Sequence, residues 1–270
     1  MRRILIFTAA SIIWLFFSAG CNNTEEVIVG PVQASINSAI NLLSFERVDP
    51  AGRRFEFRCL TDSIYDCSNY SIDFELVTAG DTFKLNFNEL FRPAFCVPPD
   101  KEAFALVNLG ELTNGTYQLP VTVNNIVATA VLTVTDSTFE ITGGDSTWTN
   151  FTRPTLRRIP ANTIWGQIGY PSVAAYDSAI SYLDSLLNIG AAPLMLTGGS
   201  YGYFWFDGSG NPDSILELGT TIPSALTIPY VHTYAGDTAA LHSLVTLYAN
   251  QGNVVEVNVI TSDGIEFKSW

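Results

Sequence analysis

The amino-acid sequence predicts two folded parts, an all-β sandwich over residues 27–147 and an α+β domain over residues 161–270. Three observations lead to this fold class. Short runs that alternate between apolar and polar residues, separated by turn residues, fill the first part and have the period of strands. Apolar residues recur at helical spacing only after Pro160. Even without its first 20 residues, a chain of 270 residues exceeds the usual size of one domain, so two domains are expected.

The first 20 residues have the layout of a secretory signal peptide. Arg2 and Arg3 form a positively charged start, and Ile4 to Phe17 is an almost unbroken apolar run that ends in small residues. The run is shorter than the ~20 residues that a membrane-spanning helix needs. We therefore predict that residues 1–20 are removed on export.

The end of this segment, Ser18-Ala19-Gly20-Cys21, resembles the lipobox of bacterial lipoproteins, with Ser18 where that family usually has Leu. In that family the cysteine is acylated and becomes the first residue of the mature chain. The resemblance implies a lipid on Cys21, a polar tether over residues 21–26, and an extracytoplasmic protein anchored to the outer membrane, facing the periplasm or the cell surface. A simply secreted protein with an incidental cysteine is the alternative.

The charge of the chain excludes some partners. The whole chain carries 13 basic and 26 acidic residues, and residues 1–20 hold two of the basic ones. Without them, 11 basic residues face 26 acidic ones, a net charge of −15. Such a charge argues against nucleic acid and against peripheral binding to anionic lipid, because both need basic patches.

The first part of the chain reads as seven strands. The alternating runs are residues 55–58, 70–76, 82–87, 103–109, 117–123, 126–134 and 138–142. Only residues 34–44 could form a helix, and the sequence does not decide this. Strands at this spacing favour a two-sheet sandwich. Within them, Leu109-Gly110-Glu111-Leu112-Thr113-Asn114-Gly115-Thr116-Tyr117 resembles a strand–turn–strand of bacterial immunoglobulin-like modules. This resemblance implies an immunoglobulin-like fold and no particular activity.

Three cysteines remain in the folded part of the chain, namely Cys59, Cys67 and Cys96. An oxidising compartment favours one disulfide among them. Cys59 and Cys67 are nearest in sequence and flank a turn-rich stretch, so we predict this pair, with Cys59 or Cys67 bonded to Cys96 as the alternative. The spacing of cysteines and histidines matches no metal-ligand pattern. We expect neither a metal nor a cofactor.

We place the domain boundary in a linker at residues 148–160. Its prolines break regular structure, and basic charge gathers there in an otherwise acidic protein. The basic residues are Arg153, Arg157 and Arg158. They fit either a binding use or packing against acidic neighbours.

The second part reads as strands at residues 163–170, 201–206, 227–234 and 254–260, with helices after the first and third strands. The first helix begins near Val173 and stops at Gly190, and the second follows Asp237 as its N-cap. Residues 264–270 can add one more strand. The order β-α-β-β-α-β resembles the ferredoxin-like fold.

No motif for catalysis is present. A nucleophile–base pair needs a histidine, and the two histidines stand in no hydrolase or phosphate-binding motif. We assign no catalytic residue, although the sequence does not decide whether the protein is an enzyme. We expect a non-enzymatic binding or assembly role with a glycan or protein ligand. The alternative is an envelope hydrolase that acts on glycans or polymers.

The predicted ligand surface is one face of the second sheet. The ferredoxin-like resemblance implies that both helices cover one face and leave the other open. Side chains alternate across a strand, which assigns a mixed aromatic and polar set to the open face. The set is Trp165, Gln167, Tyr201, Tyr203, Trp205, Tyr230, His232 and Tyr234. Aromatic rings with polar edges suit sugar rings and protein partners. The alternative is that this face packs against the first domain or the C-terminal segment.

Overall fold

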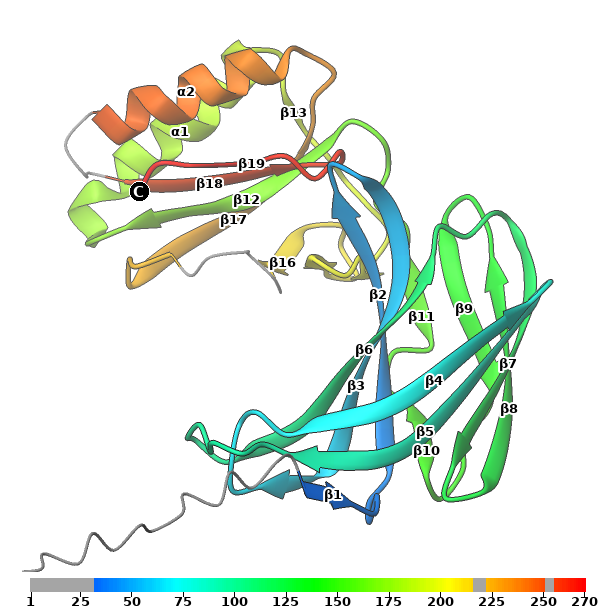
Figure 1. The fold of residues 1–270 in the computed structure, drawn as a ribbon. Coiled ribbons are helices and arrows are strands. Elements are labelled where there is room, and N and C mark those ends of the chain that lie inside the picture. The colour runs from blue at the N-terminus through cyan, green and yellow to red at the C-terminus, as the bar shows by residue number, and fades with distance from the viewer. Residues whose placement is uncertain (1–31, 216–221, 251–254) are drawn as a thin grey trace, which may run out of the picture.

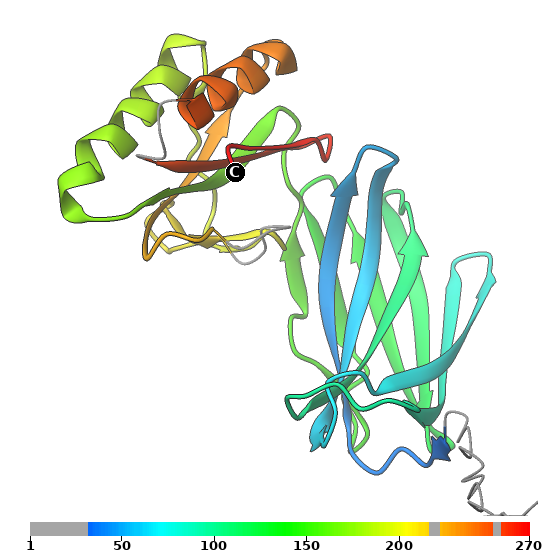
Figure 2. The same ribbon diagram turned by 60° about the vertical axis from the view of Figure 1, so that its left-hand side comes forward.

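The computed structural model describes residues 32–215, 222–250 and 255–270 (Figure 1). These residues form an 11-stranded mixed sheet, a five-stranded sheet and a three-stranded sheet. Two helices lie together on one side of the five-stranded sheet, at the opposite end of the molecule from strand β1 (Figures 1 and 2).

The large sheet contains eleven strands from the first 157 residues. They are β1 (Val32–Ala34), β2 (Ile40–Asp49), β3 (Gly52–Tyr65), β4 (Ser71–Ala79), β5 (Thr82–Arg92), β6 (Lys101–Gly110), β7 (Gly115–Val123), β8 (Ile126–Val134), β9 (Thr138–Gly143), β10 (Thr149–Phe151) and β11 (Thr155–Arg157). Their order is β10-β2-β3-β6-β4-β5-β7-β8-β9-β11, and β1 pairs with β5. Most pairs are antiparallel, but three are parallel: β10 with β2, β4 with β6, and β5 with β7.

The large sheet curls until its two ends meet. Strands β10 and β11 stand at opposite ends of the order, yet only residues 152–154 separate them in the chain. Aromatic rings show the same closure: Phe55 on β3 lies 4.7 Å from Phe139 on β9, between ring centroids. The inward side chains of all parts of the sheet therefore share one apolar core.

The predicted immunoglobulin-like sandwich is wrong, because one continuous curled sheet replaces two packed sheets. Several strands are much longer than predicted: β3 has 14 residues where the sequence predicted four, at 55–58. Strand β2 was missed within the undecided stretch 34–44 and beyond it. Its middle, residues 44–46, is buried on both faces, so β2 lacks the continuous alternation that marks a half-exposed strand. The predicted linker, residues 148–160, contributes β10 and β11.

The helix-bearing part follows. Its elements are β12 (Thr163–Tyr170), the 3-10 helix η1 (Val173–Ala175), α1 (Tyr176–Asn188), β13 (Ala192–Pro193), β14 (Gly199–Ser200), β15 (Phe204–Phe206), β16 (Pro212–Ile215), β17 (Leu226–Thr233), α2 (Thr238–Asn250), β18 (Glu256–Thr261) and β19 (Glu266–Lys268). The five-stranded sheet has the order β13-β17-β12-β18-β19, and β14-β15-β16 form the small sheet. The helices pack on one face of the five-stranded sheet.

The predicted ferredoxin-like domain is also wrong. The strand predicted at residues 201–206 is not part of the helix-bearing sheet, since β15 pairs only with β14 and β16. The stretch contains a turn: Gly202 has a φ of +82°, and the Tyr201 amide donates to the Phe204 carbonyl at 2.9 Å. Glycine adopts positive φ at little cost. The aromatic residues around Gly202 concealed this turn in the sequence.

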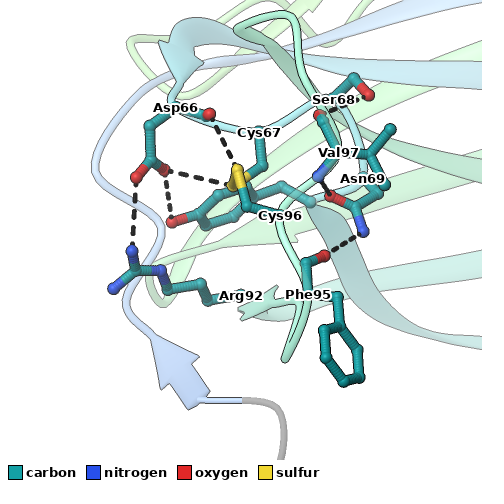
Figure 3. Close-up of a disulfide and its surroundings, with 9 residues drawn as sticks. Asp66, Cys67, Ser68, Asn69, Arg92, Phe95, Cys96 and Val97 are labelled. Atoms are coloured by element: carbon teal, nitrogen blue, oxygen red, sulfur yellow. Dashed lines mark hydrogen bonds and ion pairs between the residues drawn. A yellow bond between two sulfur atoms is a disulfide. The ribbon is translucent and has the colours of Figure 1, made fainter.

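The disulfide joins Cys67 and Cys96, whose Cα atoms are 5.1 Å apart (Figure 3). The predicted Cys59–Cys67 pair is therefore wrong, and the alternative with Cys96 is confirmed. Strand β3 continues to Tyr65, and six steps at ~3.3 Å each place the strand end about 20 Å from Cys59. Cys59 points into the core as a free thiol, and burial raises its pKa.

Replacing Cys67 and Cys96 with Ser should lower the free energy of unfolding by about 3 kcal/mol, because the bond closes a loop of 29 residues. Urea unfolding measures the change. In the parent protein, iodoacetamide should modify only Cys59, and only after denaturant is added. Rapid labelling of Cys59 in the native protein would contradict the buried position.

Candidate functional site

The residues predicted for an open aromatic face do not form one. Five are buried, two are half-buried and only Trp205 is exposed, by 41%. The buried ones are Trp165, Tyr201, Tyr230, His232 and Tyr234. The half-buried ones are Gln167 and Tyr203.

The side chains of β17 face the opposite sides of the sheet from those predicted. Tyr230 belongs to the core under the helices, and its hydroxyl donates to the Asn258 carbonyl at 2.7 Å. To reach β18, the Tyr230 ring crosses β12 at Gly166. A Cβ at Gly166 would lie 1.9 Å from the Asn258 carbonyl oxygen and 2.9 Å from the Tyr230 hydroxyl, so this hydrogen bond across β12 needs glycine. His232 and Tyr234 have the same parity as Tyr230.

The other face of the five-stranded sheet is covered by the small sheet and by the β2–β3 hairpin. The Trp165 ring lies 5.1 Å from the Tyr203 ring, between centroids. The Tyr203 hydroxyl accepts from the Val48 amide at 3.0 Å and donates to the Val48 carbonyl at 3.1 Å. Phe45, also on β2, lies 4.9 Å from Tyr203 between ring centroids. This face is therefore the joint between the large sheet and the helix-bearing part.

A buried carboxylate strengthens the joint. Glu46 accepts from the Ile159 amide at 3.1 Å, and its other oxygen lies 3.8 Å from Arg53 and 3.5 Å from Arg158. Burial raises the pKa of Glu46, and the Arg53 charge and the Ile159 hydrogen bond oppose this rise. Arg158, from the predicted arginine cluster, thus packs against an acidic neighbour.

A groove of about 560 Å³ opens beside the joint, between the large sheet and the small sheet. It is lined by Leu43, Thr152, Arg153, Pro154, Thr155, Arg157, Gly198, Gly199, Ser200 and Trp205. Trp205 and Ser200 are paired residues of β15 and β14 and therefore project from the same face of the small sheet. Phe204 and Phe206 project from the opposite face, into the apolar core of the joint.

Local contacts fix Arg157 in the groove. Its Nε donates to the Gly198 carbonyl at 2.8 Å. Gly199 has a φ of +132°, and a Cβ there would lie 3.1 Å from the same Nε. Glycine at this position therefore supplies both the backbone conformation and the space for the guanidinium.

The chemistry of the groove is that of binding. Of the ten described residues that line it, two are arginines and none is acidic or a histidine. Guanidinium groups recognise carboxylates through paired hydrogen bonds, and the Trp205 ring offers an apolar face. Across the described residues, no group of three or more His, Cys, Asp or Glu side chains is arranged to hold a metal ion. Sequence reasoning selected Trp205 but missed its partners, for which the arginine cluster at the boundary was the available signal.

Comparison with protein-family models, with curated proteins and with solved structures finds no match to this chain. Cys21 and the predicted signal peptide lie outside the described residues. None of the helices in the described ranges has the length and apolar character needed to cross a membrane.

Stability should depend on pH through His232. Burial lowers the pKa of His232 from 6.5 to about 4. Between these values the unfolded chain binds a proton that the folded protein does not, so stability is full above pH 6.5 and falls as the pH drops. For this histidine alone, the loss between pH 7.5 and pH 5 is about 2 kcal/mol.

Urea unfolding of a His232→Gln variant at both pH values tests this expectation. The variant should lose less stability on acidification than the parent protein. A His242→Gln variant, which replaces the exposed histidine, should keep the parent's pH dependence. Equal losses in the parent and the His232 variant would contradict the assignment.

Proposed function

We propose that this protein is a lipid-anchored cell-envelope protein that binds a glycan, without catalysis, in the groove beside Trp205. The observation that carries the proposal is an exposed tryptophan next to two arginines in a groove of about 560 Å³. Pockets for small ligands typically occupy ~300–1,000 Å³. The lipobox resemblance at Ser18-Ala19-Gly20-Cys21 supports the anchor.

The class of glycan follows from the charges. The chain has a net charge of −13, yet the described residues that line the groove include two arginines and no acidic residue. A sugar that bears a carboxylate could stack its ring on Trp205 while its acidic group meets Arg153 or Arg157. Uronic-acid oligosaccharides combine both features.

The hydrolase alternative has less support. Most glycoside hydrolases use two carboxyl groups, which flank the bond that breaks. None of the described residues that line the groove supplies a carboxyl group. The protein-ligand alternative has less support. A concave groove that combines one tryptophan ring with arginines fits a single sugar ring better than the broad surface of a protein partner.

Replacing Trp205 with Ala should weaken binding of uronic-acid oligosaccharides by about tenfold, because an aromatic contact of ~1.4 kcal/mol is lost. Isothermal titration calorimetry measures the affinity. The matched control is Trp270→Ala, since Trp270 is 39% exposed and does not line the groove. Arg153→Gln should reduce the preference for acidic over neutral oligosaccharides.

Absence of glycan binding by the parent protein would refute the proposal, and so would equal affinities of the parent and the Trp205 variant. Circular dichroism spectra of each variant exclude unfolding as the cause of any loss.

The anchor has a separate test. Changing Cys21 to Ser should move the protein from the membrane fraction to the soluble fraction and abolish incorporation of radiolabelled palmitate. Fractionation after expression in a Gram-negative host measures both. A variant that stays with the membranes to the same extent would contradict lipid attachment.

A further inference from the structure

The loop between β5 and β6 exposes a cluster of apolar side chains. Residues 93–99, Pro-Ala-Phe-Cys-Val-Pro-Pro, contain no charged side chain, and residues 94–99 are all exposed. Phe95 is 85% exposed, more than any other large apolar side chain in the described residues. We name residues 93–99 the apolar tip. Such exposure is unfavourable in water and marks contact surfaces.

The apolar tip is held rigidly (Figure 3). The Asn69 side chain donates to the Phe95 carbonyl at 2.8 Å and accepts from the Val97 amide at 3.1 Å. The Ser68 amide donates to the Val97 carbonyl at 2.7 Å, and the disulfide holds Cys96 between them. Because these contacts hold the backbone from the Phe95 carbonyl to Val97, the ring is presented outward without a large entropic cost on contact.

The position of the tip relates it to the predicted anchor. Val32, at the start of β1, pairs with Arg92, the residue just before the tip. Cys21 lies eleven residues before Val32, and a chain of that length spans at most about 40 Å. A lipid on Cys21 therefore keeps the start of β1, beside the tip, within about 40 Å of the bilayer, while α1 and α2 lie at the other end of the molecule (Figures 1 and 2).

We infer that the apolar tip inserts into the membrane interface and orients the anchored protein on the bilayer. This inference depends on the proposed lipid anchor. Phenylalanine, valine and proline bring apolar surface without a charge to desolvate, which suits the boundary between headgroups and acyl chains. The contact needs no basic patch, so it is compatible with a strongly acidic protein. With the tip at the membrane, the helices are held away from it.

A tryptophan placed at Phe95 tests the inference. The lipidated full chain carrying Phe95→Trp is inserted into preformed phosphatidylcholine vesicles that contain acyl-chain-brominated lipid, which quenches tryptophan at that depth. The emission of the added tryptophan is obtained by subtracting the fluorescence of the parent protein from that of the variant. It should fall by about half or more in brominated vesicles if the ring lies in the interface.

The matched control is Val173→Trp. Val173 is 80% exposed and lies in η1, next to α1. Its added emission should be the same in brominated and ordinary vesicles. Equal quenching at both positions would overturn the inference, because the tip would then have no special contact with lipid.

Vesicle flotation separates the possible failures. A protein that floats but shows no quenching at position 95 is anchored without inserting the tip, which overturns the inference, leaves the anchor intact and assigns the tip to a protein partner. A protein that does not float refutes the lipid anchor and this inference together.

Discussion

The structure depends on the burial of Glu46 between two parts of the chain. Its carboxylate is fully buried on β2 and receives the Ile159 amide from the segment that leads into β12. Arg53 on β3 and Arg158, the residue after β11, both approach its other oxygen. Removing one partner from a buried ion pair costs about 3–5 kcal/mol, because the remaining charge loses its compensation. This cluster therefore holds the helix-bearing part in a fixed position against the large sheet, which keeps the two walls of the groove beside Trp205 together.

The same joint explains why a face that looked suited to ligands is closed. The β2–β3 hairpin extends beyond the core of the large sheet, and Val48 near its end binds the Tyr203 hydroxyl through both backbone groups. Trp165 and Phe204 fill the space beneath, with ring centroids 5.5 Å apart. An aromatic face is as useful for joining two parts of a chain as for binding a sugar. Of the predicted aromatic set, only Trp205 stays exposed. It lies at the edge of the joint and points away from the apolar core that contains Phe204 and Phe206.

Sequence reasoning recovered local features and missed those that depend on distant contacts. It identified residues 163–170 and 126–134, which are β12 and β8, and it placed both helices within a few residues. It could not show that the strands before Pro160 form one curled sheet, because strand order depends on contacts between distant residues. The sides of β17 were reversed because Gly166 gives Tyr230 a path across β12. Of the candidate site, only Trp205 was predictable, since Arg157 joins it through a fold that brings β11 beside β14.

Trp205 and Phe95 are two of the five exposed aromatic side chains in the described residues, and the others are Phe104, Tyr176 and Trp270. Each of the first two is presented by a restrained backbone, Trp205 on a strand paired on both sides and Phe95 in a loop closed by the disulfide and Asn69. A mobile loop could withdraw an apolar ring from water, whereas a restrained one cannot. Acidic residues elsewhere keep the protein soluble despite this exposure. Their repulsion of anionic surfaces also means that contact with a membrane must come from apolar groups, and contact with an acidic ligand from a local positive site. The tip at Phe95 and the groove at Arg157 are the places where the proposed membrane contact and the proposed ligand contact would meet these two requirements.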